Sequence, residues 1–123
     1  MKMYSSLNVY GNVLESCCNN PKTGFFRNGK CDSSNLDAGI HTVCILVTDP
    51  FLDFSKRVGN DLSSPNPMYD FPGLKAGNKW CLCALRWKEA LDNQIAPPVF
   101  LESTHIKTLE VVEFNLLQQY AIN

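Results

Sequence analysis

The sequence lacks an excess of charge of either sign, and this narrows the classes of protein to consider. Eleven lysine and arginine residues stand against twelve aspartate and glutamate residues, a formal net charge of -1. Proteins that bind nucleic acid usually carry a clear basic excess. We therefore expect no nucleic-acid partner.

Long apolar runs are also absent. The best run, Val43 to Val47, is bounded by Thr42 and Thr48 and is far too short to cross a bilayer. Residues 1–10 contain no apolar stretch of the kind found in secretory signals. We expect a cytoplasmic protein with no membrane partner, which binds an unknown small molecule or another protein.

What the chain does have is the size and composition of one folded domain. It contains 123 residues, of which 45% are hydrophobic and 19% are charged. We expect a single domain over residues 8–121, preceded by a flexible segment at residues 1–7.

One strand and one helix are predicted in the middle of the chain. Residues 40–48 are rich in β-branched side chains, which is typical of a buried strand. Asp49 followed by Pro50 predicts a helix start, with the Asp49 carboxylate as N-cap. Gly59 provides the stop signal for this helix.

The second half of the chain predicts a long loop and further helices. Residues 60–77 hold three prolines and two glycines, too many for regular structure. Asn78 is a plausible N-cap for a helix from Lys79 to about Asn93. A strand at 99–101, a short element around 109–112 and a terminal amphipathic helix should follow. Because strands and helices mix without a βαβ repeat, the sequence predicts an α+β fold.

Six cysteines form an even number, which in a secreted chain would suggest disulfides. Without a secretory signal, however, thiols are normally kept reduced. Cys17 and Cys18 are neighbours and poor disulfide partners for each other, and Cys44 lies inside the apolar run. We therefore predict reduced thiols.

A metal site is one alternative for these side chains. Its candidate ligands are Cys17, Cys31, His41, Cys44, Cys81, Cys83 and His105, since thiolate and imidazole are the ligands that zinc prefers. The spacing argues against a metal site, because the sequence has no Cys-x-x-Cys pair. On the predicted helix, Cys81 and Cys83 would also point about 200° apart. We predict buried structural thiols, with no metal and no cofactor.

A reactive thiol is the second alternative. With Asn78 as N-cap, Cys81 would lie in the first helical turn, where the helix dipole favours a thiolate. His41 or His105 would then be the candidate base of a thiol-dependent enzyme. The competing interpretation is an inert, half-buried cysteine.

The long loop offers a third kind of site. Asn60, Asp61, Lys75 and Arg86 are the candidate ligand-binding residues of a pocket between this loop and the helix that begins near Trp80. Asn60 and Asp61 are equally suited to satisfying the amides of a turn. We favour a small binding or interaction domain with such a pocket, ahead of a thiol enzyme and a zinc-binding module.

Several rare sequence words occur in the same order as in one known family. They are Thr23-Gly24-Phe25-Phe26-Arg27, His41-Thr42-Val43-Cys44, Gly59-Asn60-Asp61-Leu62-Ser63, Phe71-Pro72-Gly73-Leu74-Lys75, Trp80-Cys81-Leu82-Cys83-Ala84, Arg86-Trp87, Ala96-Pro97-Pro98-Val99 and Thr104-His105. The chain resembles, over about residues 8–121, an uncharacterised family of small, mainly bacterial proteins, domain of unknown function 2237.

The resemblance implies a compact, two-layer α+β fold, with a small sheet packed by helices and long ordered loops, in a cytoplasmic protein. It implies no activity, cofactor or catalytic residue. The family pattern has paired cysteines where this chain has Lys30-Cys31. A metal site that needed the first of that pair would be incomplete here.

Overall fold

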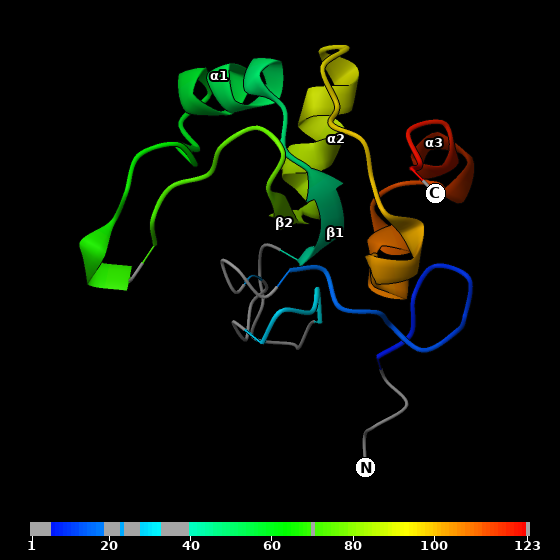
Figure 1. The fold of residues 1–123 in the computed structure, drawn as a ribbon. Helices are drawn as coiled ribbons and strands as arrows, with labels where there is room; N and C mark the ends of the chain where they lie inside the picture. The colour runs from blue at the N-terminus through cyan, green and yellow to red at the C-terminus, as the bar shows by residue number, and fades with distance from the viewer. Residues whose placement is uncertain (1–5, 19–22, 24–27, 33–39, 70, 123) are drawn as a thin grey trace.

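The computed structural model describes residues 6–18, 23, 28–32, 40–69 and 71–122. Its elements in chain order are β1 (His41–Leu46), α1 (Asp49–Arg57), the 3-10 helix η2 (Pro67–Tyr69), β2 (Lys79–Cys83), α2 (Ala84–Asp92), η3 (Leu101–Ser103), η4 (Ile106–Glu110) and α3 (Phe114–Gln118). The two strands and three α-helices confirm the predicted α+β class (Figure 1).

The strands β1 and β2 form a two-stranded antiparallel sheet. Cys44 pairs with Cys81, and Ile45 pairs with Trp80, with a register shift between His41 and Val43. The segment after α2 runs beside β1, where the Phe100 N–H donates to the Cys44 carbonyl over 2.9 Å. The sheet is therefore small, and its faces are covered by quite different parts of the chain.

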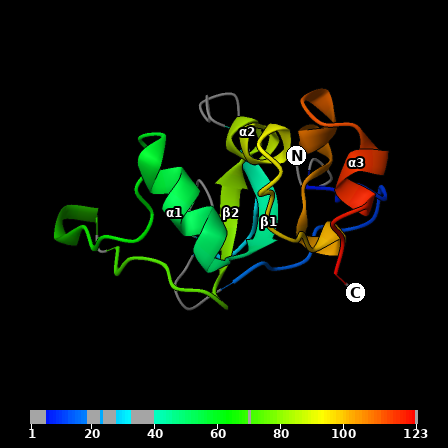
Figure 2. The same ribbon diagram turned by 90° about the horizontal axis from the view of Figure 1, so that it is seen from above.

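One face of the sheet packs on the main hydrophobic core. Side chains alternate between the faces of a strand, so Val43, Ile45, Trp80 and Leu82 share one face and join Trp87 of α2 in this core. Figures 1 and 2 show α1 and α2 on one side of the strands. Figure 1 shows the described residues between 6 and 32, which we call the N-terminal segment from here on, passing on the opposite side. The other face, which carries Cys44 and Cys81, meets the N-terminal segment.

The core is anchored by a buried tryptophan. Trp87 has no exposed surface, and its indole N–H donates to the Pro97 carbonyl over 3.0 Å. Its ring meets that of Tyr120 edge to face, with the centroids 5.6 Å apart. Trp87 thereby connects α2 to the chain at Pro97 and to Tyr120 near the C-terminus.

The predicted strand and first helix are both present, with one correction at the helix start. Thr48, not Asp49, is the N-cap of α1, because the Thr48 hydroxyl accepts the Phe51 N–H over 3.3 Å. Asp49 and Pro50 occupy the first turn. Gly59 follows the helix with a φ of 94°, as expected for a glycine stop.

The predicted helix over 79–93 is wrong in its first five residues. Residues 79–83 form β2, and α2 begins only at Ala84. Asn78 caps a turn instead of a helix, since its side-chain oxygen accepts the Lys75 N–H over 2.8 Å. The apolar run fits a helical stripe by its spacing, but pairing with β1 decides its conformation.

The remaining elements agree with the sequence in outline. Residues 60–77 form a loop interrupted only by η2 among the residues described, and α3 is the predicted terminal helix. The predicted strand at 99–101 is reduced to two isolated bridges, from Val99 to Ile45 and to Ala121, followed by η3. Of the predicted N-terminal segment, residues 1–5 lie outside the described residues, while the Leu7 carbonyl accepts the Ile106 N–H over 2.8 Å.

Candidate functional site: a buried cluster of four cysteines

The sheet face opposite the main core presents two cysteines next to each other, and the N-terminal segment adds two more. Cys17 is bonded to Cys44, and Cys31 is bonded to Cys81, with Cα atoms 5.8 and 5.2 Å apart. The sulfur atoms of Cys17, Cys31 and Cys81 all lie within 4.8 Å of one another. All four sulfurs therefore occupy one small volume.

This cysteine cluster (Cys17, Cys31, Cys44 and Cys81) is shielded from water. Cys17, the most exposed member, shows only 4% of its surface. Phe100 packs against the cluster, and the Lys79 ammonium lies 4.5 Å from the centre of the Phe100 ring.

Two threonine hydroxyls fix the backbone beneath the strand cysteines. The Cys81 N–H donates to Thr23 Oγ1 over 2.7 Å, and the Cys44 N–H donates to Thr104 Oγ1 over 3.2 Å. Thr23 and Thr104 have no exposed surface. A buried N–H without a partner is costly, so these hydroxyls hold the two strand cysteines in place.

The cluster corrects two predictions from the sequence. The four cluster cysteines are joined in disulfide bonds in this structure, whereas Cys18 and Cys83 form no disulfide bond and are half-buried. The expectation from spacing that the candidate ligands do not converge is also wrong, because four cysteines meet through the tertiary fold, while the absence of a metal stays a prediction. Connectivity between distant cysteines cannot be read from spacing alone.

The other three candidate ligands lie elsewhere. Cys83 and His41 pair with each other in the strand register. Since β2 is a strand, Cys81 and Cys83 lie on the same face of it, not 200° apart as on a helix.

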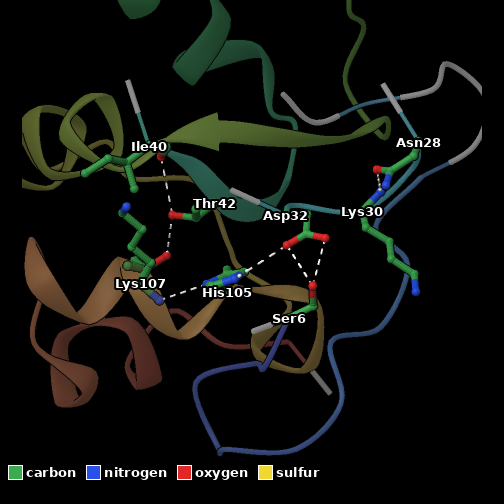
Figure 3. Close-up of polar contacts among 9 residues, drawn as sticks. Ser6, Asn28, Lys30, Asp32, Ile40, Thr42, His105 and Lys107 are labelled. Carbon is green, nitrogen blue, oxygen red and sulfur yellow. Dashed lines mark hydrogen bonds and ion pairs between the residues drawn. The ribbon is translucent and has the colours of Figure 1, made fainter. Parts of the chain in front are cut away.

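His105 belongs to a separate polar network with Asp32, Ser6 and Lys107 (Figure 3). His105 Nδ1 accepts the Lys107 N–H over 3.0 Å, so the proton of the neutral imidazole belongs on Nε2. His105 Nε2 lies 3.6 Å from Oδ1 of Asp32, and the Ser6 hydroxyl donates to both Asp32 oxygens. The Asp32 carboxylate therefore separates the Ser6 hydroxyl from the His105 imidazole. A nucleophile and its base would contact each other directly.

The prediction of a nucleophilic Cys81 depends on a position in the first turn of a helix, and the structure does not have it there. Cys81 lies in a strand, is 1% exposed and is bonded to Cys31, so it has neither a helix dipole nor access to solvent. Catalytic roles for Cys81, His41 and His105 stay predictions. Sequence reasoning missed Asp32, Thr23 and Thr104 as site residues, although Thr23 and Thr104 belong to the sequence words shared with the family.

The four predicted ligand-binding residues have separate partners. Asp61 accepts hydrogen bonds from the Ser63 and Ser64 N–H groups and the Ser64 hydroxyl, the last over 2.7 Å. These bonds, the Ser64 hydroxyl above all, lower the pKa of Asp61 below its usual value of 3.8.

Asn60, Lys75 and Arg86 also have partners within the chain. The Asn60 carbonyl accepts the Ser55 hydroxyl over 2.6 Å. Lys75 donates its N–H to Asn78, and Arg86 forms an ion pair with Glu89 over 3.2 Å. A ligand-binding role for Asn60, Asp61, Lys75 and Arg86 stays a prediction, and turn chemistry accounts for the contacts of Asp61.

A pocket of about 420 Å³ lies beside the cysteine cluster, away from the predicted ligand site. Its lining residues are Tyr10, Glu15, Ser16, Lys79, Phe100, Leu101, Glu102, Ser103 and Ile122. Phe100 is shared by the pocket and the cluster. None of the four predicted ligand-binding residues contributes to this lining.

The fold and the cluster define a small α+β domain whose N-terminal segment is bonded to its sheet through four buried cysteines. Over residues 7–121 the chain matches the family described as "Uncharacterized protein conserved in bacteria (DUF2237)". The chain belongs to this family, as the resemblance implied. No curated protein matches the chain. In the described part of the chain, no helix is long and apolar enough to cross a membrane.

Proposed function

We propose that the reduced protein is a zinc-binding module in which Cys17, Cys31, Cys44 and Cys81 hold one zinc ion. The observation that carries this proposal is the convergence of four buried cysteine sulfurs from distant parts of the chain. In a reducing compartment such as the cytoplasm, where we predict the protein to act, these groups are thiols and thiolates.

The distances suit tetrahedral coordination. With zinc–sulfur bonds of about 2.3 Å, the sulfurs of a four-cysteine site lie about 3.8 Å apart. Three of the cluster sulfurs already lie within 4.8 Å of one another, and the fourth is bonded to one of these three. Reduction of the two disulfide bonds would free the four side chains to rotate toward these distances.

Four thiolates leave no coordination position for water or substrate, so the ion would be structural, not catalytic. Two ligands come from the strands and two from the N-terminal segment. Zinc would therefore hold this segment on the sheet, and its binding free energy would stabilise the folded state.

Metal analysis of the reduced protein tests this proposal. We expect one zinc per chain after purification with a phosphine reductant and without added zinc. Cobalt(II) should replace the ion and give the absorption bands of a tetrahedral thiolate site. Reduced, folded protein that neither retains nor binds zinc would contradict the proposal, and stoichiometric iron would assign the four sulfurs to that metal instead.

Single substitutions sharpen the test. Cys31→Ser and Cys44→Ser should each reduce the zinc retained against a competing chelator to less than about a tenth per chain, since each removes a ligand. Cys83→Ser is the matched control, because Cys83 lies on the same strand as Cys81 but outside the cluster. It should keep its zinc.

A second candidate function, the binding of a small molecule, is supported by the pocket beside Phe100. The pocket combines an ammonium, from Lys79, with two aromatic rings and two carboxylates, a mixture typical of a ligand site. Thermal-shift screening of metabolites against the protein and Lys79→Glu tests it. Ligands of this pocket should stabilise the first protein and not the second, whereas equal shifts would place them elsewhere.

A further inference from the structure

We infer that the cysteine cluster is a redox switch, which exchanges one zinc ion for the two disulfide bonds of this structure. This inference rests on the proposed zinc site and adds how that site would be controlled. The same four sulfurs that suit zinc are joined in this structure in two specific pairs, Cys17–Cys44 and Cys31–Cys81.

The N-terminal segment would be joined to the strands in both states, the disulfide-bonded one and the zinc-bound one. Each disulfide joins one cysteine of the N-terminal segment to one cysteine of a strand, with sequence separations of 27 and 50 residues. Zinc bound to all four sulfurs would join the same segments. The chain therefore need not refold when the site changes state, and only the sulfurs move, between bonding distance and about 3.8 Å.

The chemistry balances with a peroxide as oxidant. Two molecules of hydrogen peroxide take four electrons from the four thiolates, and two sulfur–sulfur bonds form. Each peroxide oxygen–oxygen bond breaks, and four protons from solvent complete four water molecules. The disulfide sulfurs are poor ligands compared with thiolates, so the zinc ion leaves. A dithiol reductant reverses the change by thiol–disulfide exchange.

The structure also indicates which pair reacts first. Cys17 is the most exposed member of the cluster, and its neighbour Ser16 lines the pocket. The Phe100 ring lies between this pocket and the cluster, and the Phe100 N–H bonds to the Cys44 carbonyl. None of the four cysteines lines the pocket itself, but Cys17 follows the lining residue Ser16 and Cys44 is hydrogen-bonded to the lining residue Phe100. A small reagent in the pocket would thus meet the Cys17–Cys44 pair before the Cys31–Cys81 pair.

The test begins with reduced protein that carries zinc. Hydrogen peroxide is added, released zinc is followed with a chromogenic chelator, and disulfides are mapped by mass spectrometry. We expect release of one zinc per chain, Cys17–Cys44 and Cys31–Cys81 as the products, and an unchanged far-ultraviolet circular dichroism spectrum. In partial reduction by a dithiol, Cys17 and Cys44 should be the first cysteines to become alkylated.

Two variants make the result specific. Phe100→Ala should release zinc several-fold faster, whereas Phe114→Ala, which removes a ring that packs on the main core, should not. The double variant Cys18→Ser with Cys83→Ser should behave as the parent protein.

The outcomes separate the two proposals. Absence of zinc from the reduced protein contradicts the zinc site itself. Zinc that stays bound while the peroxide is consumed, or products that pair Cys18 or Cys83, would overturn the switch and leave the zinc site intact.

Discussion

Cys44 and Cys81 are direct partners across the two strands, yet each is bonded to a cysteine of the N-terminal segment and not to the other. The sheet already holds the two strands together through its backbone. The sulfur bonds instead fix a segment that has little regular structure of its own among the residues described. The stability of this segment on the sheet should therefore depend on the state of the cysteines.

The first prediction concerns the oxidised protein. Replacing Cys17 and Cys44 together by alanine removes a bond that closes a separation of 27 residues, which should lower the free energy of unfolding by about 3–4 kcal/mol. Urea unfolding followed by circular dichroism measures the change. Cys83→Ala, which breaks no disulfide, should cost much less. Equal losses in both proteins would mean that the Cys17–Cys44 bond contributes nothing beyond side-chain packing.

The second prediction concerns the threonines beneath the strand cysteines. Thr104→Val removes the hydroxyl that accepts the buried Cys44 N–H, and should cost about 1–3 kcal/mol. Thr104→Ser keeps the hydroxyl and serves as the matched control. The same comparison at Thr23 tests the Cys81 N–H. If valine and serine variants unfold at the same urea concentration, the hydrogen bonds do not position the cluster.

These threonines illustrate what the sequence reveals and what it does not. The strand near 40–48 and the helix near 49–58 follow from local signals, such as β-branched residues and a glycine stop, and both are confirmed. Lys79–Cys83 has an apolar spacing that suits either a helix or a buried strand, and its partner strand lies more than thirty residues away in sequence. Only the tertiary pairing decides between them.

The sequence indicates which cysteines are candidates for the cluster, but not that they meet. Thiolates and imidazoles stand out as candidate ligands in the sequence, and four of the seven candidates do meet. Their convergence depends on a strand that the sequence assigns to a helix, and on an N-terminal segment without local periodicity. The supporting hydroxyls of Thr23 and Thr104 are common residues whose role appears only once the fold brings them to Cys81 and Cys44.

The third prediction concerns Asp61 and pH. Hydrogen bonds from the Ser64 hydroxyl and the Ser63 N–H favour the ionised carboxylate and hold the pKa of Asp61 below 3.8. Because the folded pKa is lowered, the stabilisation is present above pH 3.8 and is lost as the pH falls through the folded value. Carbon-detected NMR titration should give an Asp61 pKa below 3.8, and Ser64→Ala should raise it. An unchanged pKa in Ser64→Ala would assign the shift to another contact.

The last prediction concerns Gly73, at the close of the long loop. Gly73 has a φ of 84°, and a Cβ atom there would overlap the carbonyl oxygen of Ser63 and lie 3.1 Å from its carbon. Both atoms belong to the backbone, so neither can rotate away. Gly73→Ala therefore combines a left-handed conformation with a steric clash, and should lower the free energy of unfolding by about 3 kcal/mol.

Gly77 in the same loop is the matched control for this prediction. It has a φ of 96°, but nothing lies within 4 Å of the position that its Cβ would take. Gly77→Ala should therefore cost only the conformational term, about 1–2 kcal/mol. Thermal and urea unfolding of the two variants separate the effects, because both share the conformational term and only Gly73→Ala adds the clash. Equal costs at the two positions would mean that the loop at Ser63 moves to accept a methyl group, and that the close approach of Gly73 to Ser63 does not hold the loop in place.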